Sequence, residues 1–283
     1  MAKQAVAIVV DSTANLPPDV VAECGIYVMP QILNWEGETL RDGVDITAGE
    51  FYRRLATAQR MPTTSQPSAG EFHEFFSRVA DDADSIVALT LSQKLSGTYA
   101  SANAAKEMMG DYPLEIIDTG TAATALGFIA LEAAETAARE AAQAGVAEAA
   151  RRMIPYAHAL FVVDTLEFLH RGGRIGGAQR LIGSMLAVKP VLRLINGAIE
   201  PAARVRTKRK AVAHMLDLVS QDASGNARFM AAAMHAAAPA EAQFIYERLE
   251  SLSPQKLFLT ELTPVIGAHV GPGTVGVAYY AGP

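Results

Sequence analysis

The first half of the chain alternates short apolar runs with helix signals, and this alternation is the feature that most restricts its fold. The runs at residues 6–10, 85–91 and 114–118 are rich in Val, Ile and Leu, as expected for strands buried on both faces. Capping boxes at residues 47–50 and 68–71 begin helices between them. Strands that alternate with helices predict an α/β fold, with a mainly parallel sheet and helices on both faces.

The second half follows a different pattern. Residues 189–195 and 200–206 are predicted strands on either side of an Asn-Gly dipeptide, which favours a tight hairpin turn. Further strand and helix segments follow, and no internal repeat is evident. We therefore expect residues 1–157 to form an N-terminal α/β domain and residues 158–283 a smaller mixed α/β domain, with a ligand between them.

Two glycine pairs lie at the junction of these halves. Gly172-Gly173 and Gly176-Gly177 follow a predicted strand, and a helix is predicted from the second pair to Ala187. Glycines permit a left-handed backbone or the close approach of a ligand or another backbone. Their spacing, GGxxGG, differs from the GxGxxG of dinucleotide-binding folds, and no acidic residue follows about 20 positions later. The stretch therefore predicts a close contact but not a nucleotide site.

Composition excludes several classes of function. The net charge of −6 argues against a nucleic-acid-binding protein, and a single cysteine cannot form a disulfide within the chain. Six apolar residues precede Asp11, too few for a signal peptide or a membrane span. The six histidines lack the spacing of metal ligands. We expect a cytoplasmic protein without a metal or cofactor.

Polar turns after two of the predicted strands suggest an anion site. Residues 11–13 and 92–98 follow neighbouring strands, and ligands bind at the carboxyl ends of strands in such sheets. The loop at residues 63–68 carries further hydroxyls. Ser96 stands before a predicted helix, where it caps the helix, binds an anion, or does both. His269 lies in a glycine-rich segment, although a lone histidine in a loop more often has a structural role.

A serine acyl-hydrolase is the alternative of a different class. Ser96, Asp164 and His269 occur in the chain order of an α/β-hydrolase triad. The nucleophile elbow would need glycines where Lys94 and Thr98 stand, so this alternative lacks its most specific motif.

Six motifs together resemble the DegV family, in the family's order. They are V-D-S-T-A-N-L-P, T-S-Q-P-S-x-G-E-F, L-S-G-T-Y-x-S-A, D-T-L-E-F-L-x-R-G-G-R-I-G, K-P-V-L with R-V-R-T, and H-x-G-P-G. The resemblance spans the chain from about Val10 to Tyr279. It implies a bacterial two-domain protein that holds a long-chain fatty acid of the palmitate or oleate class between its domains. Some members are acyl-carrying subunits of a fatty acid kinase.

The resemblance also implies roles for single residues. The carboxylate-binding positions fall on Thr64 and Ser96, with His269 as the family's loop histidine. Arg206 corresponds to an arginine linked to the kinase, and Arg174 follows the glycine pair; we assign both to phosphate or partner docking. The chain departs from the family at two positions: Asn15 replaces a usual aspartate, and Val270 a common threonine.

The acyl tail needs an apolar tunnel, and the glycine junction suggests its walls. The candidates are Phe161, Phe168, Leu181, Ile182, Met185 and Leu186, although a place in the core is the default for each. We expect a lipid-binding protein rather than an enzyme, which presents its fatty acid to a separate ATP-dependent kinase.

Overall fold

The computed structural model describes residues 3–139, 142–184 and 188–283. Four strands form a parallel sheet in the order β2-β1-β6-β7. Their bounds are Ala7–Asp11 for β1, Tyr27–Met29 for β2, Ile86–Thr90 for β6 and Leu114–Asp118 for β7. A short 3-10 helix, η1 (Ser12–Ala14), follows β1, and helix α1 (Pro18–Glu23) comes next.

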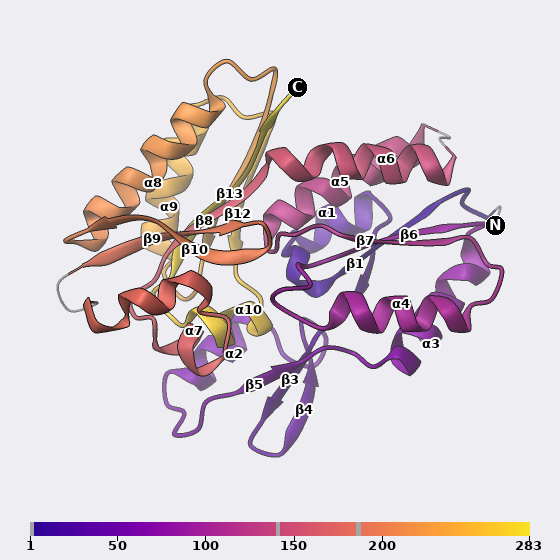
Figure 1. Ribbon diagram of the computed structural model, residues 1–283, viewed down its shortest axis with the longest axis horizontal. Helices are drawn as coiled ribbons and strands as arrows, with labels where there is room; N and C mark the ends of the chain where they lie inside the picture. The colour runs from indigo at the N-terminus through magenta and orange to yellow at the C-terminus, as the bar shows by residue number, and fades with distance from the viewer. Residues whose placement is uncertain (1–2, 140–141, 185–187) are drawn as a thin grey trace.

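Helices cover both faces of this sheet, as the alternating pattern predicts. On one face lie α3 (Ala69–Asp82) and α4 (Thr98–Met108), and on the other α5 (Thr124–Ala138) and α6 (Gln143–Met153) (Figure 1). The capping box of α3 is formed, because Ser68 and Glu71 each accept the other's backbone N–H. The parallel α/β architecture of this half is therefore confirmed.

The second sheet has six strands in the order β10-β9-β8-β13-β11-β12, and it is mixed: β11 pairs parallel with β12, and the other pairs are antiparallel. The strands are β8 (Ala157–Val162), β9 (Lys189–Ile195), β10 (Ala198–Val205), β11 (Arg228–His235), β12 (Lys256–Glu261) and β13 (Val275–Gly282). The turn from β9 to β10 has positive φ angles at Asn196 and Gly197, as the Asn-Gly signal predicts. The division at residue 157 stays our proposal; η2 (Ile154–Tyr156) leads into β8 there.

Helix α5 lies between the two large sheets. Its apolar residues surround the helix, and ten of its fifteen residues are buried, which is expected only for a helix packed on all sides. Across it, Phe128 stacks on Phe258 of β12, and Glu132 pairs with Arg228 of β11 at 2.8 Å. Helices α8 (Lys208–Ala223) and α9 (Pro239–Glu250) cover the opposite face of the six-stranded sheet (Figure 1). The two halves therefore share one core.

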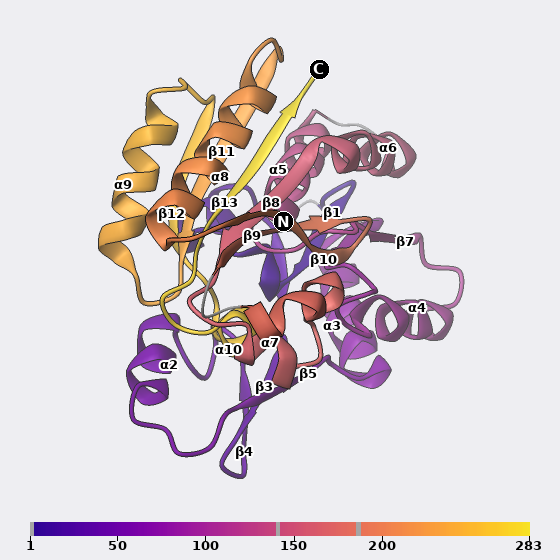
Figure 2. The ribbon, with the colours of Figure 1, turned by 60° about the vertical axis from the view of Figure 1, so that its left-hand side comes forward.

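A third, small antiparallel sheet contains the hairpin that the sequence predicts, with its turn at residues 34–38 and residues 39–41 returning, and adds one strand that was not expected. It has the order β4-β3-β5, with β3 at Ile32–Trp35, β4 at Glu38–Arg41 and β5 at Thr63–Ser65. The apolar character of residues 26–33 predicts one strand before that turn, but Pro30, which lacks an N–H, separates β2 from β3. Likewise β5 lies in a segment expected to be a loop. Figure 2 shows this sheet beside α2 (Ala48–Leu55), α7 (Glu167–Arg171) and α10 (Pro264–Val270).

Two other segments differ from expectation. The glycine-rich segment near the C-terminus forms α10, with Pro264 at its first position and Gly271 in a left-handed conformation after its end. The segment after Gly176 is a 3-10 helix, η3 (Gly176–Ser184), and the predicted helical residues 185–187 lie outside the described part. Among the described residues, no helix combines the length and apolar character needed to span a membrane.

Candidate functional site

A cavity lies where the carboxyl ends of the parallel strands, the small sheet and the six-stranded sheet meet. It encloses about 920 Å³ of space not occupied by atoms, including its open mouth. The wall is mainly apolar, and Leu91, Ala159, Phe161, Leu194 and Val265 contribute to it. The cavity therefore offers an apolar ligand a place between the two halves of the chain.

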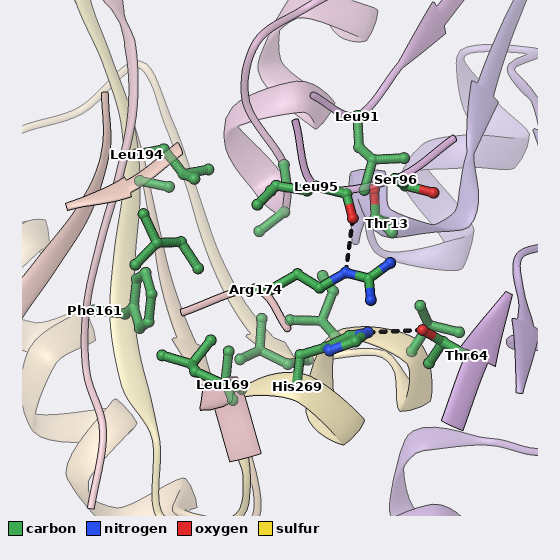
Figure 3. A pocket seen from close by; sticks show the side chains of 18 of the residues that line it. Thr13, Thr64, Leu91, Leu95, Ser96, Phe161, Leu169, Arg174, Leu194 and His269 are labelled. Atoms are coloured by element: carbon green, nitrogen blue, oxygen red, sulfur yellow. Dashed lines mark hydrogen bonds between the residues drawn. The ribbon is translucent and has the colours of Figure 1, made fainter. Parts of the chain in front are cut away.

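The polar side chains of the wall gather at one end of the cavity. Thr64 of β5, Ser96 before α4, Arg174 after α7 and His269 of α10 lie together there, opposite Phe161 (Figure 3). They come from four separate parts of the chain. Thus the proposed carboxylate-binding residues, together with Arg174, are neighbours in the fold.

Ser96 both supports a helix start and lines the cavity. Its Oγ accepts a hydrogen bond from the backbone N–H of Thr98, the first residue of α4, at 3.3 Å. It also lies 2.8 Å from Oγ1 of Thr98. The N-cap position itself is Gly97, which has no side chain to bond. Capping and lining the cavity are therefore compatible roles, and the positive end of the α4 dipole favours an anion nearby.

Arg174 brings a positive charge to the polar end. Its Nε donates to the carbonyl of Leu95 at 2.8 Å, and Nη1 donates to the carbonyl of Gly172 at 2.6 Å. Within the described ranges no acidic side chain forms an ion pair with it. The guanidinium is thus held in place by carbonyl groups while its charge stays uncompensated.

His269 is neutral at physiological pH. Burial, reinforced by the positive charge of Arg174, lowers the pKa of this histidine to about 4. Its Nε2 lies 2.7 Å from Oγ1 of Thr64, whereas Nδ1 has no hydrogen-bond partner in the part of the chain that the structure covers. If Nε2 carries the proton, it donates to Thr64, and the hydroxyl hydrogen of Thr64 is free to point into the cavity.

The first glycine pair has a steric reason at Gly172. A Cβ atom at this position would lie 2.2 Å from Nδ1 of His269, so only glycine lets the backbone pass the imidazole ring. The close approach predicted for the junction is therefore present, and it involves the histidine of the site.

Replacing Gly172 with alanine should displace His269. The added methyl group cannot share the space of Nδ1, so the ring must move and its bond to Thr64 must lengthen. We expect a loss of roughly 1–3 kcal/mol in the free energy of unfolding, measured with urea. We also expect a higher His269 pKa, measured by NMR, because a displaced ring is less buried.

Gly173→Ala is the matched control. This neighbour has a positive φ of 71° but nothing within 4 Å of its added Cβ, so it bears only the backbone strain. The His269 signals should stay unchanged in that variant. Unaltered His269 signals in Gly172→Ala would contradict the packing role.

The remaining predicted residues lie in different places. Phe161 lines the cavity, whereas Phe168 lines an adjoining surface hollow that also includes Thr64, Arg174 and His269. Ile182 is 41% exposed and lies outside the cavity wall, while its neighbour Leu181 is fully buried in the core. Met185 and Leu186 lie outside the described residues. Arg206 is exposed and away from the cavity.

The structure does not assemble the hydrolase triad. Asp164 is half exposed and pairs with Lys208 at 3.0 Å, His269 bonds to Thr64, and Ser96 bonds to Thr98. A working triad needs the serine bonded to the histidine and the histidine oriented by the acid. Neither bond is present among the described residues, so the geometry disfavours this alternative.

Sequence reasoning missed Gln31, which also lines the cavity, whereas Thr13 of the cavity wall belongs to the predicted polar turn at residues 11–13. Gln31 is 2% exposed and stands at the break between β2 and β3. A signal was present, since a glutamine inside the apolar run of residues 26–33 is unusual. It could not be recognised as part of the site until β3 and β5 were known to pair.

Comparison with known proteins identifies the family. The model of the DegV family, described as an uncharacterised protein family, matches residues 5–282. The chain belongs to the DegV family. A DegV domain-containing protein of Streptomyces coelicolor is 43% identical over 276 residues, which cover 96% of this chain and 97% of the relative.

Solved DegV structures share the fold over nearly the whole chain. A DegV family protein from Thermus thermophilus, studied for fatty acid binding, has a TM-score of 0.91 and 34% identity, covering 98% of this chain and 99% of its own. DegV from Bacillus subtilis, a fatty acid binding protein, has a TM-score of 0.90 and 33% identity, covering 99% of this chain and 100% of its own.

The two departures from the DegV pattern have structural consequences. Asn15 adopts a left-handed conformation, donates to Oγ1 of Thr260 at 2.8 Å and accepts from the N–H of Thr263 at 2.9 Å. It therefore ties η1 to the end of the six-stranded sheet without a charge. Val270 contributes apolar wall to the cavity, and the hydrogen bond between His269 and Thr64 forms without a neighbouring hydroxyl.

Proposed function

We propose that this DegV family protein binds a long-chain fatty acid, with the carboxylate at the end of the cavity that Thr64, Ser96 and His269 form beside the charge of Arg174, and the tail against Phe161. The observation that carries the proposal is the polarity of the cavity: a long apolar wall with its donors gathered at one end. The fatty acid binding of the Thermus and Bacillus relatives supports the same class of ligand.

The energetics of such a ligand fit this arrangement. Burying an acyl chain contributes about 0.8 kcal/mol per CH₂, so a C16 tail supplies on the order of 10 kcal/mol before ordering costs. Burying an ionised carboxylate without hydrogen-bond or charge partners costs more free energy than burial of the tail supplies. The hydroxyl of Thr64 and the positive charge of Arg174 offset this cost at the polar end. Neutral His269 supports Thr64 without adding a second cation.

Lipid extraction tests the proposal directly. Denaturing mass spectrometry of an organic extract from the purified protein should detect a co-purified C16 or C18 acid. Delipidated protein should melt several degrees higher with palmitate or oleate, because a ligand at 100 times its Kd adds about 2.7 kcal/mol of stability. Neither a bound acid nor a shift in melting temperature would be compatible with the proposed function.

We further infer that a separate ATP-dependent kinase phosphorylates the bound carboxylate. The adjoining hollow shares Thr64, Arg174 and His269 with the cavity and adds Arg171, so the polar end is reachable from the surface. Arg206 is exposed at the end of the β10 hairpin and forms no ion pair within the described ranges, which suits partner docking. A reconstituted assay should then show that Arg206→Ala loses phosphorylation more than fatty acid binding. A cytoplasmic location stays a prediction.

A further inference from the structure

Gln31 holds a buried position at the polar end of the cavity. Its backbone N–H donates to Oγ of Ser12 at 3.0 Å, and that hydroxyl donates to Oδ2 of Asp42 at 2.5 Å. The side chain is 2% exposed, so few other conformations are open to it. Gln31 is thus fixed by the turn after β1 rather than by the ligand.

The side chain of Gln31 ends a chain of hydrogen bonds that begins at Ser96. Oγ1 of Thr98 donates to Oε1 of Gln31 at 3.2 Å. A hydroxyl has one hydrogen, so Thr98 must accept in its 2.8 Å bond with Ser96. The hydrogen of Ser96 is therefore committed to Thr98, and its Oγ also accepts from the Thr98 backbone N–H. Ser96 has no hydrogen left for a ligand in this arrangement.

The other end of the Gln31 amide has no partner. Nε2 is buried and forms no hydrogen bond to any described residue, although Gln31 lines the cavity. A buried donor without an acceptor is unfavourable, so an acceptor in the cavity would satisfy it. Turning the amide over would put Oε1 in the place of the unpartnered Nε2, where it would repel a carboxylate bound there. Thr98 and a bound carboxylate thus favour the same orientation.

We propose that Gln31 determines head-group recognition: its Nε2 donates to the ligand carboxylate, while Ser96 acts through Thr98 to hold the amide in the donating orientation. This proposal rests on the proposed fatty acid function and assigns Gln31 a direct contact with the ligand. It also makes the site selective for an acceptor head group. A carboxylate accepts from Nε2 with both oxygens available, whereas a fatty alcohol offers a weaker, neutral acceptor.

Gln31→Glu is the sharpest test, because it exchanges only the unpartnered NH₂ for an oxygen. Oε1 can still accept from Thr98, so the hydrogen-bond chain keeps its direction. With delipidated protein at pH 8, palmitate affinity measured by calorimetry should fall at least tenfold, and 1-hexadecanol affinity should change less than about threefold. At pH 5 the loss of palmitate affinity relative to wild type should be smaller, because the buried glutamic acid gains a proton and can donate a hydrogen bond again.

Controls separate this proposal from the proposed function. Gln255→Glu makes the same change of charge at an exposed position away from the cavity and should bind both ligands like wild type. Failure of wild type to bind palmitate would overturn the fatty acid function itself. Suppose instead that wild type binds palmitate, but Gln31→Glu loses affinity for palmitate and 1-hexadecanol equally, or for neither. That result would overturn the role of Gln31 and leave the fatty acid function standing.

A measurement on the wild type covers the case in which Gln31→Glu does not fold. The side-chain amide protons of Gln31, followed by ¹⁵N NMR, should shift downfield when palmitate binds, as amide protons do when they donate to a charged acceptor. Shifts of the same size with 1-hexadecanol, or no shift with palmitate, would contradict a direct contact with the carboxylate.

Discussion

Replacing Thr64 and Ser96 together with alanine should weaken palmitate binding by about two to four powers of ten. Losing the Thr64 hydrogen bond to the carboxylate costs about 1.5–3 kcal/mol. Removing Ser96 releases the Gln31 amide that it holds through Thr98, which should cost a comparable amount, and each 1.4 kcal/mol is a factor of ten in Kd. Thr64 lies 2.7 Å from the imidazole of His269 and Ser96 holds the chain that reaches Gln31, so the two losses act on different donors. Calorimetry or displacement of a fluorescent fatty acid would measure the change.

The fold should survive this double change. Both side chains are only partly buried and lie at the cavity surface. Thr63→Ala is the matched control, because Thr63 adjoins Thr64 on β5 but is exposed and does not line the cavity. An unchanged Kd in the double variant, with the control also unchanged, would refute the assignment of the carboxylate to this end even if a fatty acid is bound.

Ala159→Phe should abolish binding of long chains while sparing short ones. Ala159 lies on β8 in the apolar part of the wall, two residues before Phe161, and is 4% exposed. A ring at this position fills space that the tail would occupy. Excluding roughly six CH₂ groups forfeits about 5 kcal/mol, so palmitate affinity should fall by at least three powers of ten. Octanoate, titrated in parallel, should lose far less.

Substitutions of increasing size at Ala159 separate a filled cavity from a damaged core. Ala159→Val adds less volume and should produce an intermediate loss for palmitate. Overpacking alone costs about 1–3 kcal/mol of stability, so urea unfolding of each variant separates a damaged core from a filled cavity. Normal palmitate affinity in a stable Ala159→Phe protein would mean that the tail lies elsewhere.

Local patterns predicted most of the architecture. A strand buried on both faces can be recognised from its continuous apolar run, and a helix start from its capping box, because both depend on neighbouring residues. The Asn-Gly hairpin is of the same kind, since its positive φ angles depend on two adjacent residues. These signals were sufficient to predict an α/β fold with a parallel sheet in one half and a hairpin in the other.

The walls of the cavity could not be predicted in the same way. Phe161 faces the cavity and Ile182 faces solvent, yet both were equally good apolar candidates. The side that each faces depends on the pairing of β8 with its neighbours and on the turn of η3 after Gly176. Likewise α10 was expected to be a loop, because glycines near Pro264 obscured a helix that packs against the rings of α2.

Sequence patterns alone indicated a parallel α/β half, a mixed second half and the polar motifs of the DegV family in one chain. They also placed Thr64, Ser96, Arg174 and His269 among the residues to test. That these four meet at one end of an apolar cavity follows from the tertiary structure (Figure 3). The same holds for Gln31, which is linked to Ser96 through Thr98. Hydrogen bonds between distant segments, such as that between His269 and Thr64, cannot be predicted from a local pattern, because they depend on how the sheets and helices pack.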